Sequence, residues 1–228
     1  MNAVRKIAAR GLAFALTLLG TTSAHCTMDV IDLRRIDAVG GDAFAGKAKA
    51  TACLGCHGTA GIAPVPMFPN LAGQNAEYLY WALLEFQRAA RADSPMTAQV
   101  APLADADMRD LATYFAALPA ASADGAARPD ARAAALFLRG DPARGIPPCQ
   151  GCHGADAGGH PLAAATASYR AYPILRGQHA TYLTQRLRDF RAGQRVDSSN
   201  DRIMQGVARS LDDDAIDQLS AWLQAGAR

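Results

Sequence analysis

Two short runs of cysteine, histidine and glycine carry the most reactive side chains of this 228-residue chain. The first is Cys53-Leu54-Gly55-Cys56-His57, and the second is Cys149-Gln150-Gly151-Cys152-His153. Cysteines three positions apart on a helical turn project from one face, so both sulfurs can reach one edge of a flat ligand. The histidine that follows is carried beneath that ligand. This is the pattern by which a c-type haem is attached, with the histidine nitrogen bound to the iron.

Two other interpretations of the four motif cysteines fit less well. A redox dithiol of the thioredoxin type belongs with alternating strands and helices, which this alanine-rich, valine-poor sequence does not offer. A zinc site would pool the four cysteines across about 95 residues and leave His57 and His153 unexplained. We therefore expect two covalently bound haem c groups, with both histidines as proximal ligands. The predicted thioether positions are Cys53, Cys56, Cys149 and Cys152.

The sequences around the two motifs repeat one another. Pro69–Phe86 matches Pro173–Phe190 without a gap, and 9 of 18 positions are identical. Before the motifs, Gly41–Gly46 resembles Gly140–Gly145. Each unit is therefore predicted to contain a haem motif, a helix, a loop that carries a methionine, and a closing helix.

No segment shows convincing strand alternation, and the periodic apolar positions predict helices. Gly73-Gln74 and Gly177-Gln178 are predicted turns that open one helix in each unit. Asp105 and Asp213 are predicted N-caps of the closing helices. The predicted fold is all-α, with two tandem domains related by internal duplication. The domains are expected at 39–118 and 130–228, with a linker at 119–129.

A methionine recurs at one place in both units. Met96 and Met204 stand at the same distance before the closing helix, which predicts that they are the distal iron ligands. Met67 has no counterpart in the second unit, and Met108 aligns with a core position of the closing helix. The histidine rivals in the second unit are His160 and His179. His179 matches Asn75 of the first unit, and His160 lies in a stretch that the first unit lacks. A thioether in both distal sites would close the irons to substrates, which disfavours a dihaem peroxidase.

The first 24 residues predict a cleaved signal peptide at 1–24. Basic residues precede an apolar run at Gly11–Gly20, and small residues follow at Thr22–Ala24. The apolar run is shorter than the ~20 residues needed to span a bilayer, so an uncleaved anchor is the lesser alternative. Export to the periplasm is therefore expected. Cys26 is predicted to be a free thiol rather than a lipid-anchored N-terminus.

Charge is nearly balanced once the predicted signal peptide is removed. The remainder has 20 basic and 21 acidic side chains, which argues against a nucleic-acid partner. Residues 25–118 hold 7 basic and 10 acidic groups, whereas 119–228 hold 13 and 11, so the halves differ in sign. Arg91 and Arg195 recur at one repeat position, and each suits either a haem propionate or a neighbouring surface acid.

Together, these motifs resemble the dihaem cytochrome c4 family over roughly residues 39–225. The phrases that carry the resemblance are the two CxxCH motifs, Pro-x-Leu-x-Gly-Gln at 69–74 and 173–178, and Met-x6-Leu-x-Asp at 96–105 and 204–213. The resemblance implies two class I cytochrome c domains related by a pseudo-twofold axis, with their haem edges close together. It also implies a periplasmic carrier, soluble or loosely associated with a membrane. Such a carrier would take electrons from a quinol-oxidising complex or a dehydrogenase and pass them towards a terminal oxidase.

Three segments depart from the family pattern. They are His25–Val39 before the first unit, and Ala155–Tyr172 and Ser199–Ile203 in the second. We expect the extra residues of the second unit to offer a docking surface for a particular partner. The alternative function is a fixed cytochrome subunit of a periplasmic dehydrogenase, which would carry the same haems but keep a permanent partner.

Overall fold

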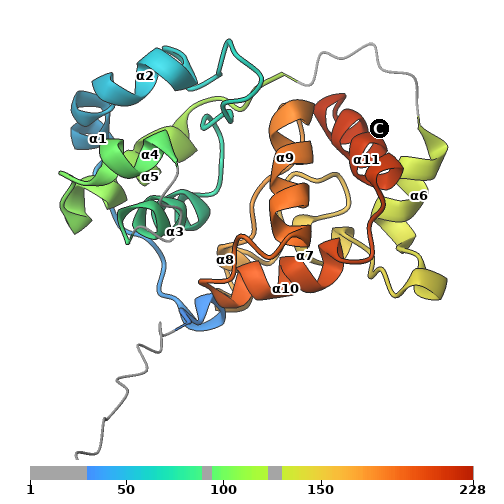
Figure 1. Ribbon diagram of the computed structural model, residues 1–228. Coiled ribbons are helices and arrows are strands. Elements are labelled where there is room, and N and C mark those ends of the chain that lie inside the picture. Colours follow the sequence, from blue (N-terminus) through green and yellow to red (C-terminus); the bar gives the residue numbers. More distant parts are fainter. Residues whose placement is uncertain (1–29, 89–93, 123–129, 228) are drawn as a thin grey trace, which may run out of the picture.

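The computed structural model describes residues 30–88, 94–122 and 130–227, and these form eleven α-helices and two short 3-10 helices (Figure 1). The predicted signal peptide, Cys26, Arg91 and most of the predicted linker lie outside the described residues. Within these ranges there is no strand, and pairing is limited to two isolated bridges. The predicted all-α class is confirmed. No helix in the described part of the chain is long and apolar enough to cross a bilayer.

The helices fall into two sets that follow the repeat. In the first half they are α1 (Ala43–Lys49), α2 (Thr51–His57), α3 (Ala76–Gln87), α4 (Pro95–Val100) and α5 (Asp105–Ala117). In the second half they are α6 (Ala131–Arg139), α7 (Gln150–His153), α8 (Ala167–Arg170), α9 (Ala180–Arg191), α10 (Ser199–Ala208) and α11 (Asp213–Gln224). The 3-10 helices are η1 (Leu33–Arg35) and η2 (Pro142–Arg144).

The closing helix is the centre of each half. Helix α5 packs against α1 and α3, and α11 packs in the same way against α6 and α9 (Figure 1). The first core gathers around the buried residues Met108, Leu111 and Phe115 of α5. The second gathers around α11 and is larger, because Phe137 of α6 packs against Trp222. The repeat therefore corresponds to two cores of the same plan, each built on its closing helix.

The resemblance between Gly41–Gly46 and Gly140–Gly145 does not mark equivalent structure. Gly41–Gly46 leads into α1, where the Asp42 side chain caps the helix by accepting from two backbone N–H groups. Gly140–Gly145 instead follows α6, and both of its glycines have positive φ (68° and 70°) that end the helix and turn the chain. The true counterpart of Asp42 is Asp130, which caps α6 in the same way. The predicted alignment was wrong here because one glycine-aspartate phrase can start a helix or form a turn.

The predicted N-caps of the closing helices are displaced by one residue. Asp105 is the first residue of α5, so Ala104 is the N-cap, and its N–H is accepted by Asp107 at 2.9 Å. Asp213 is likewise the first residue of α11, and the cap is Asp212. Acids in the first turn also stabilise a helix by their charge. The two aspartates therefore do mark the start of each closing helix, but the N-cap lies one residue earlier than predicted.

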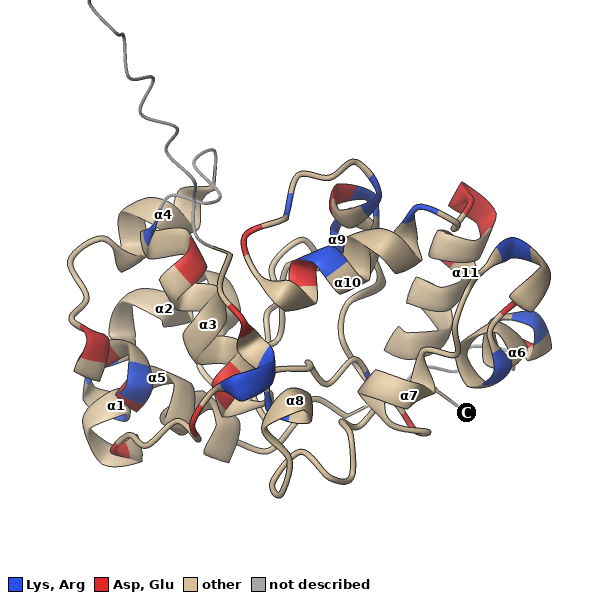
Figure 2. Cartoon of the chain, turned by 90° about the horizontal axis from the view of Figure 1, so that it is seen from below, with Lys and Arg blue, Asp and Glu red and all other residues tan. Residues whose placement is uncertain are grey.

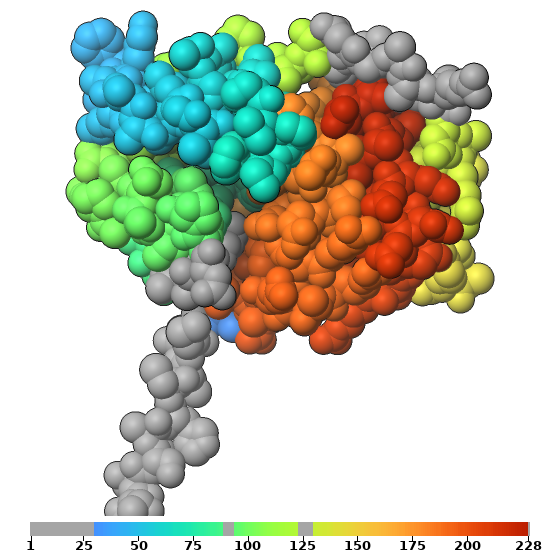
Figure 3. Space-filling model, turned by 45° about the horizontal axis from the view of Figure 1, so that its top comes forward, coloured from blue at the N-terminus to red at the C-terminus, as the bar shows by residue number. Residues whose placement is uncertain are grey.

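The two halves meet along one seam. On the face drawn in Figure 3, teal residues of the first half lie directly against orange residues of the second. Arg195 lies in this seam, 5% exposed, with its guanidinium 3.2 Å from Glu85 Oε2 on α3 and 3.3 Å from Asp201 Oδ1 on α10. The guanidinium also covers the ring of Phe190 at 4.5 Å. Arg195 therefore pairs with acids, which is one of its two predicted roles. The pair is buried and joins the halves, rather than lying on the surface.

Residues 30–38, which we call the N-terminal strap, precede the first half but bind to the second. The N–H of Ile31 donates to the carbonyl of Asp197 at 3.0 Å, and Ser199 N–H donates back to Ile31 at 2.8 Å. Leu33 N–H donates to Ser199 Oγ at 3.0 Å. The apolar contacts of the strap involve Leu33, Ile36, Ala171 and Trp81. The three segments that depart from the family pattern therefore pack together, because the strap contacts both α8 and α10.

Candidate functional site

Both cysteine motifs end a short helix at their histidine. The first lies on α2, and the second begins at the N-cap of α7. Gly58 and Gly154 follow the histidines with φ of 78° and 81°, a conformation that favours glycine. A Cβ on Gly58 would lie 1.9 Å from the carbonyl oxygen of Ile62, and one on Gly154 would lie 2.1 Å from that of Gly159. The glycine after each motif is thus required to fold the next loop back over the histidine.

His57 and His153 are held in the same way. Each is 5% exposed, and each has its Nδ1 2.9 Å from a proline carbonyl, Pro69 for the first and Pro173 for the second. A carbonyl can only accept, so Nδ1 carries the hydrogen and Nε2 keeps its lone pair. Burial lowers the pKa of both imidazoles, which favours the neutral form. Within the described ranges neither Nε2 has a hydrogen-bond partner, which leaves both for an iron.

The environment of the cysteines argues against a redox dithiol. Cys53 and Cys149 are half-buried, and desolvation raises the pKa of both thiols, that of Cys149 to about 11. A reactive dithiol needs a lowered pKa instead. A shared zinc site is not formed either, because no three His, Cys, Asp or Glu side chains converge among the described residues. Thioether formation, which uses the sulfur covalently, is the chemistry that fits these positions.

The predicted methionine loops are helices. Met96 lies in α4, where Ser94 Oγ caps the first turn by accepting from Met96 N–H at 3.3 Å. Met204 lies in α10, which is capped by Ser198. Both methionines are half-buried, and α4 and α10 pack against α3 and α9 respectively. Met96 lies near the start of α4, whereas Met204 lies in the middle of α10. Serine before the first turn is a helix-start signal that would have predicted these helices.

The rival ligand candidates have other surroundings. Met67 is 64% exposed, whereas Met108 is 1% exposed and packs in the core of α5, as predicted. His179 donates from Nε2 to the carbonyl of Ala63 across the seam at 2.9 Å. His160 stacks on the ring of Tyr169, with centroids 3.6 Å apart. Met96 and Met204 therefore stay the predicted distal ligands of the two halves.

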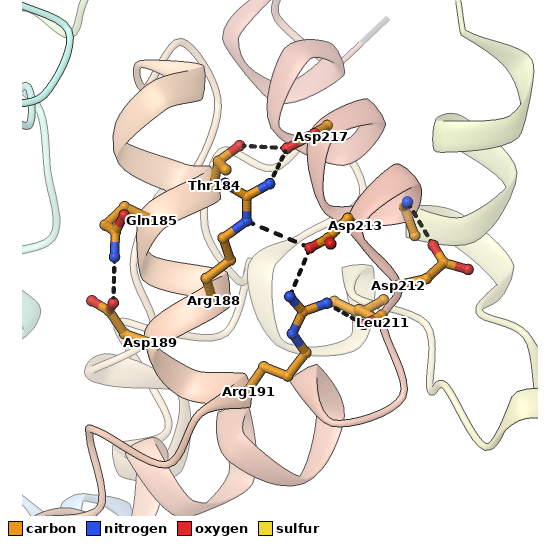
Figure 4. Close-up of polar contacts among 10 residues, drawn as sticks. Thr184, Gln185, Arg188, Asp189, Arg191, Leu211, Asp212, Asp213 and Asp217 are labelled. Carbon is orange, nitrogen blue, oxygen red and sulfur yellow. Dashed lines mark hydrogen bonds and ion pairs between the residues drawn. The ribbon is translucent and has the colours of Figure 1, made fainter.

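An ion-pair network fastens two helices of the second half to each other (Figure 4). On α9, Arg191 lies 2.7 Å from Asp213 and donates to the carbonyl of Leu211 at 3.0 Å. Arg188, one turn earlier, lies 3.3 Å from Asp217 and 3.6 Å from Asp213. The network links α9 to α11 at the surface of this half.

Two glutamines that were predicted only as parts of turns join the halves. Gln178 Oε1 accepts from Asn70 N–H at 2.9 Å, and its Nε2 donates to the carbonyl of Asn70 at 3.0 Å. Gln74 makes the same pair of bonds, both 2.8 Å, with the backbone of Ile174. Both side chains are buried, at 6% and 7% exposed. The identical Gly-Gln phrases in the repeat were the only sequence signal for this contact.

The residues present suit two haem c groups: each half offers two cysteines beside a neutral, oriented histidine, with a methionine on a separate helix. The family model for Cytochrome c matches residues 43–119 and 133–227. Cytochrome c4 of Pseudomonas aeruginosa is 40% identical over 186 residues, which is 81% of this chain and 88% of that protein. A thiosulfate dehydrogenase electron acceptor of Thiomonas intermedia is 34% identical over 185 residues, 78% of this chain and 79% of that protein.

A solved structure agrees with the sequence relatives. Reduced cytochrome c4 from Pseudomonas stutzeri superposes with a TM-score of 0.71 and 36% identity, covering 82% of this chain and 99% of that one. The chain therefore binds two covalent haem c groups and carries electrons rather than catalysing a reaction. It belongs to the cytochrome c4 family of dihaem cytochromes c.

Proposed function

We propose that this cytochrome is a periplasmic electron carrier in which histidine and methionine hold each iron. The ligands would be His57 and Met96 in a first domain at 39–118, and His153 and Met204 in a second at 130–228. The observation that carries this proposal is the matched pair of buried histidines, each donating Nδ1–H to a proline carbonyl. That contact orients the ring and raises the basicity of Nε2.

The haem groups, when bound, supply reversible one-electron chemistry. The chain orients Nε2 through the proline carbonyl and excludes water by burying the imidazole. Met96 on α4 and Met204 on α10 would supply the thioether ligands. A methionine sulfur in the distal position raises the reduction potential and leaves no open site for peroxide or oxygen. This arrangement suits electron transfer between proteins.

The ligand assignment is tested by Met96→Ala and Met204→Ala. Each substitution should remove half of the methionine-to-iron absorption of the oxidised protein and let one iron bind added imidazole. Met67→Ala is the matched control, because Met67 is an exposed methionine of the first half and should leave the spectrum unchanged. If Met67→Ala removed the absorption and Met96→Ala did not, the assignment would be overturned.

For partners, we propose a quinol-oxidising complex or a dehydrogenase as donor and a terminal oxidase as acceptor. Basic and acidic positions are scattered over both halves in the view of Figure 2. By count, the first half is mildly acidic and the second mildly basic. Weak electron-transfer encounters are steered by such charge, so exchange with a donor should slow as ionic strength rises. A rate that stays constant from low salt to several times physiological ionic strength would argue against a charge-steered carrier.

The second candidate is a fixed subunit of a periplasmic dehydrogenase. It is favoured by the relative from Thiomonas intermedia, which is described as a thiosulfate dehydrogenase electron acceptor. Purification from membranes and periplasm without added salt separates the two proposals. A free carrier elutes alone at the size of one chain, whereas a subunit elutes with a stoichiometric enzyme partner.

A further inference from the structure

The peptide group that holds each histidine also donates across the seam. The carbonyl of Pro69 accepts from His57 Nδ1 at 2.9 Å. The N–H on the other end of the same peptide group belongs to Asn70, and it donates to Gln178 Oε1 at 2.9 Å. One planar peptide therefore connects the histidine of the first half to a side chain of the second half.

The same connection runs in the opposite direction. The carbonyl of Pro173 accepts from His153 Nδ1 at 2.9 Å, and the N–H of the next residue, Ile174, donates to Gln74 Oε1 at 2.8 Å. Gln74 belongs to the first half. Each half thus contributes one glutamine to the hydrogen-bond chain that ends on the other half's histidine, as expected of a pseudo-twofold contact.

The contact of Gln178 with Asn70 is buried, and that of Gln74 with Ile174 is partly buried. Asn70 is 7% exposed, like Gln74. Gln178 Oε1 also accepts from the N–H of His179 at 3.0 Å, and Gln74 Oε1 accepts from the N–H of Asn75 at 2.9 Å. In a low-dielectric interior, successive hydrogen bonds polarise one another. An acceptor on the N–H end of a peptide makes its carbonyl a stronger acceptor for the histidine at the other end.

We infer that Gln74 and Gln178 are positioning residues through which each half sets the reduction potential of the other half's haem. This rests on the proposed ligation by His57 and His153. Gln178 strengthens the Pro69 carbonyl as an acceptor, which makes His57 a better electron donor to iron. A stronger donor stabilises the oxidised iron, so each glutamine lowers the potential of the haem across the seam.

The test is Gln178→Leu, compared with Gln74→Leu, in the full-length protein carrying both haems. The methionine methyl resonances of the reduced protein, assigned by their loss in Met96→Ala and Met204→Ala, follow each haem separately during a redox titration. Gln178→Leu should shift the reduction equilibrium of the first-half haem about 3- to 10-fold towards the reduced form, or about 30–60 mV. Gln74→Leu should do the same to the second-half haem only.

A second readout reports the hydrogen bond directly. The Nδ1–H proton of His57 should move upfield in reduced Gln178→Leu, because its bond to Pro69 weakens, while that of His153 stays in place. His179→Ala is the matched control: it removes a hydrogen bond across the seam, to the carbonyl of Ala63, without touching either proline peptide. It should move neither proton and neither potential.

The outcomes separate this inference from the ligand assignment. If Gln178→Leu moved both haems equally, or moved only the haem of its own half, the glutamines would be general clamps and the inference would be wrong. It would be equally wrong if His179→Ala produced the same shifts as Gln178→Leu. Loss of the methionine resonances in the unsubstituted protein would instead defeat the proposed ligand set.

Discussion

The two halves bring a helix across the closing helix by different means. In the first half, α1 approaches α5 so closely that a Cβ on Gly46 would lie 2.1 Å from the carbonyl oxygen of Asp110. In the second half, α6 instead packs against α11 through Phe137, whose ring centroid lies 5.1 Å from that of Trp222. One architecture is thus stabilised by backbone proximity in one copy and by aromatic packing in the other.

The polar contacts diverge in a similar way while one position is retained. Gln87 of α3 donates to the carbonyl of Leu103 at 2.6 Å, and Arg191, its counterpart in α9, donates to the carbonyl of Leu211 at 3.0 Å. Arg191 adds an ion pair with Asp213 that a glutamine cannot make. The contact between these two positions is therefore the same in both halves, whereas the charge of the side chain that makes it differs.

The largest effect is expected where the second half depends on aromatic packing. Phe137→Ala removes a side chain that is 1% exposed, so it should lower the free energy of unfolding by about 3–5 kcal/mol. Phe44→Ala on α1 is the matched control, because Phe44 is 84% exposed and should change stability by less than about 0.5 kcal/mol. Denaturant unfolding of the haem-loaded protein measures both. Equal effects would contradict the contrast between the halves.

The first half should be sensitive to small additions instead. Gly46→Ala places a methyl group against the carbonyl of Asp110, and the strain should destabilise the protein by about 2 kcal/mol. Gly40→Ala, just before α1, has nothing within 4 Å of the added Cβ, so it should change stability by less than about 0.5 kcal/mol. Thermal unfolding of the two variants compares them. A tolerated Gly46→Ala would show that α1 can move away from α5 freely.

A smaller difference is expected from the hydroxyl groups that link α3 to α5 in the first half and α9 to α11 in the second. The Tyr80 hydroxyl donates to Asp105 at 2.6 Å and accepts from Arg109 at 3.1 Å. Tyr80→Phe should therefore lower the unfolding free energy by about 1 kcal/mol. Its counterpart Thr184 reaches Asp217 only at 3.4 Å, so Thr184→Ala should change stability by less than about 0.5 kcal/mol. The reverse order, measured by denaturant unfolding, would contradict the geometry.

The smallest effect concerns acid. Hydrogen bonds from the Lys49 ammonium hold the pKa of Asp107 and Asp110 below the ordinary value near 3.9. A carboxyl whose pKa is lower in the folded chain than in the unfolded chain stabilises the fold at pH values above its unfolded-state pKa. That stabilisation is lost as the pH falls through its folded-state pKa. Lys49→Gln should therefore flatten the decline in melting temperature below about pH 4. Lys47→Gln on the same helix should not, and an equal flattening would contradict the assignment.

Much of the fold could be predicted because its signals are local. The matched phrases Pro69–Phe86 and Pro173–Phe190 correspond to the same helix in both halves, and the apolar periodicity that predicted the helices is confirmed. The two haem motifs were recognisable because the attachment chemistry confines cysteine and histidine to five consecutive positions. Ser94 and Pro95 also form a helix-start signal, so the helical methionine segments were predictable in principle.

The contacts across the seam could not be predicted in the same way. In the sequence, Gln74 and Gln178 look like ordinary turn residues. Whether a side-chain amide is buried depends on the part of the protein that packs against it, and the local sequence does not reveal that. Arg195 was predicted to meet a propionate or a surface acid, yet it pairs with Glu85 of the other half. Such partners are set by how two folded units dock, and one sequence without its relatives contains no direct record of that geometry.

The N-terminal strap gives this protein an order of assembly. The bond from Leu33 to Ser199 joins residues 166 positions apart, so the beginning of the described chain is completed only by a segment near its end. Contacts of such long separation close late, because the intervening loop must first lose its freedom. A chain stopped before α10 would leave Leu33 without the Ser199 hydroxyl that its N–H binds. The contacts of the strap with α10 can therefore form only once that helix is in place, near the end of the chain.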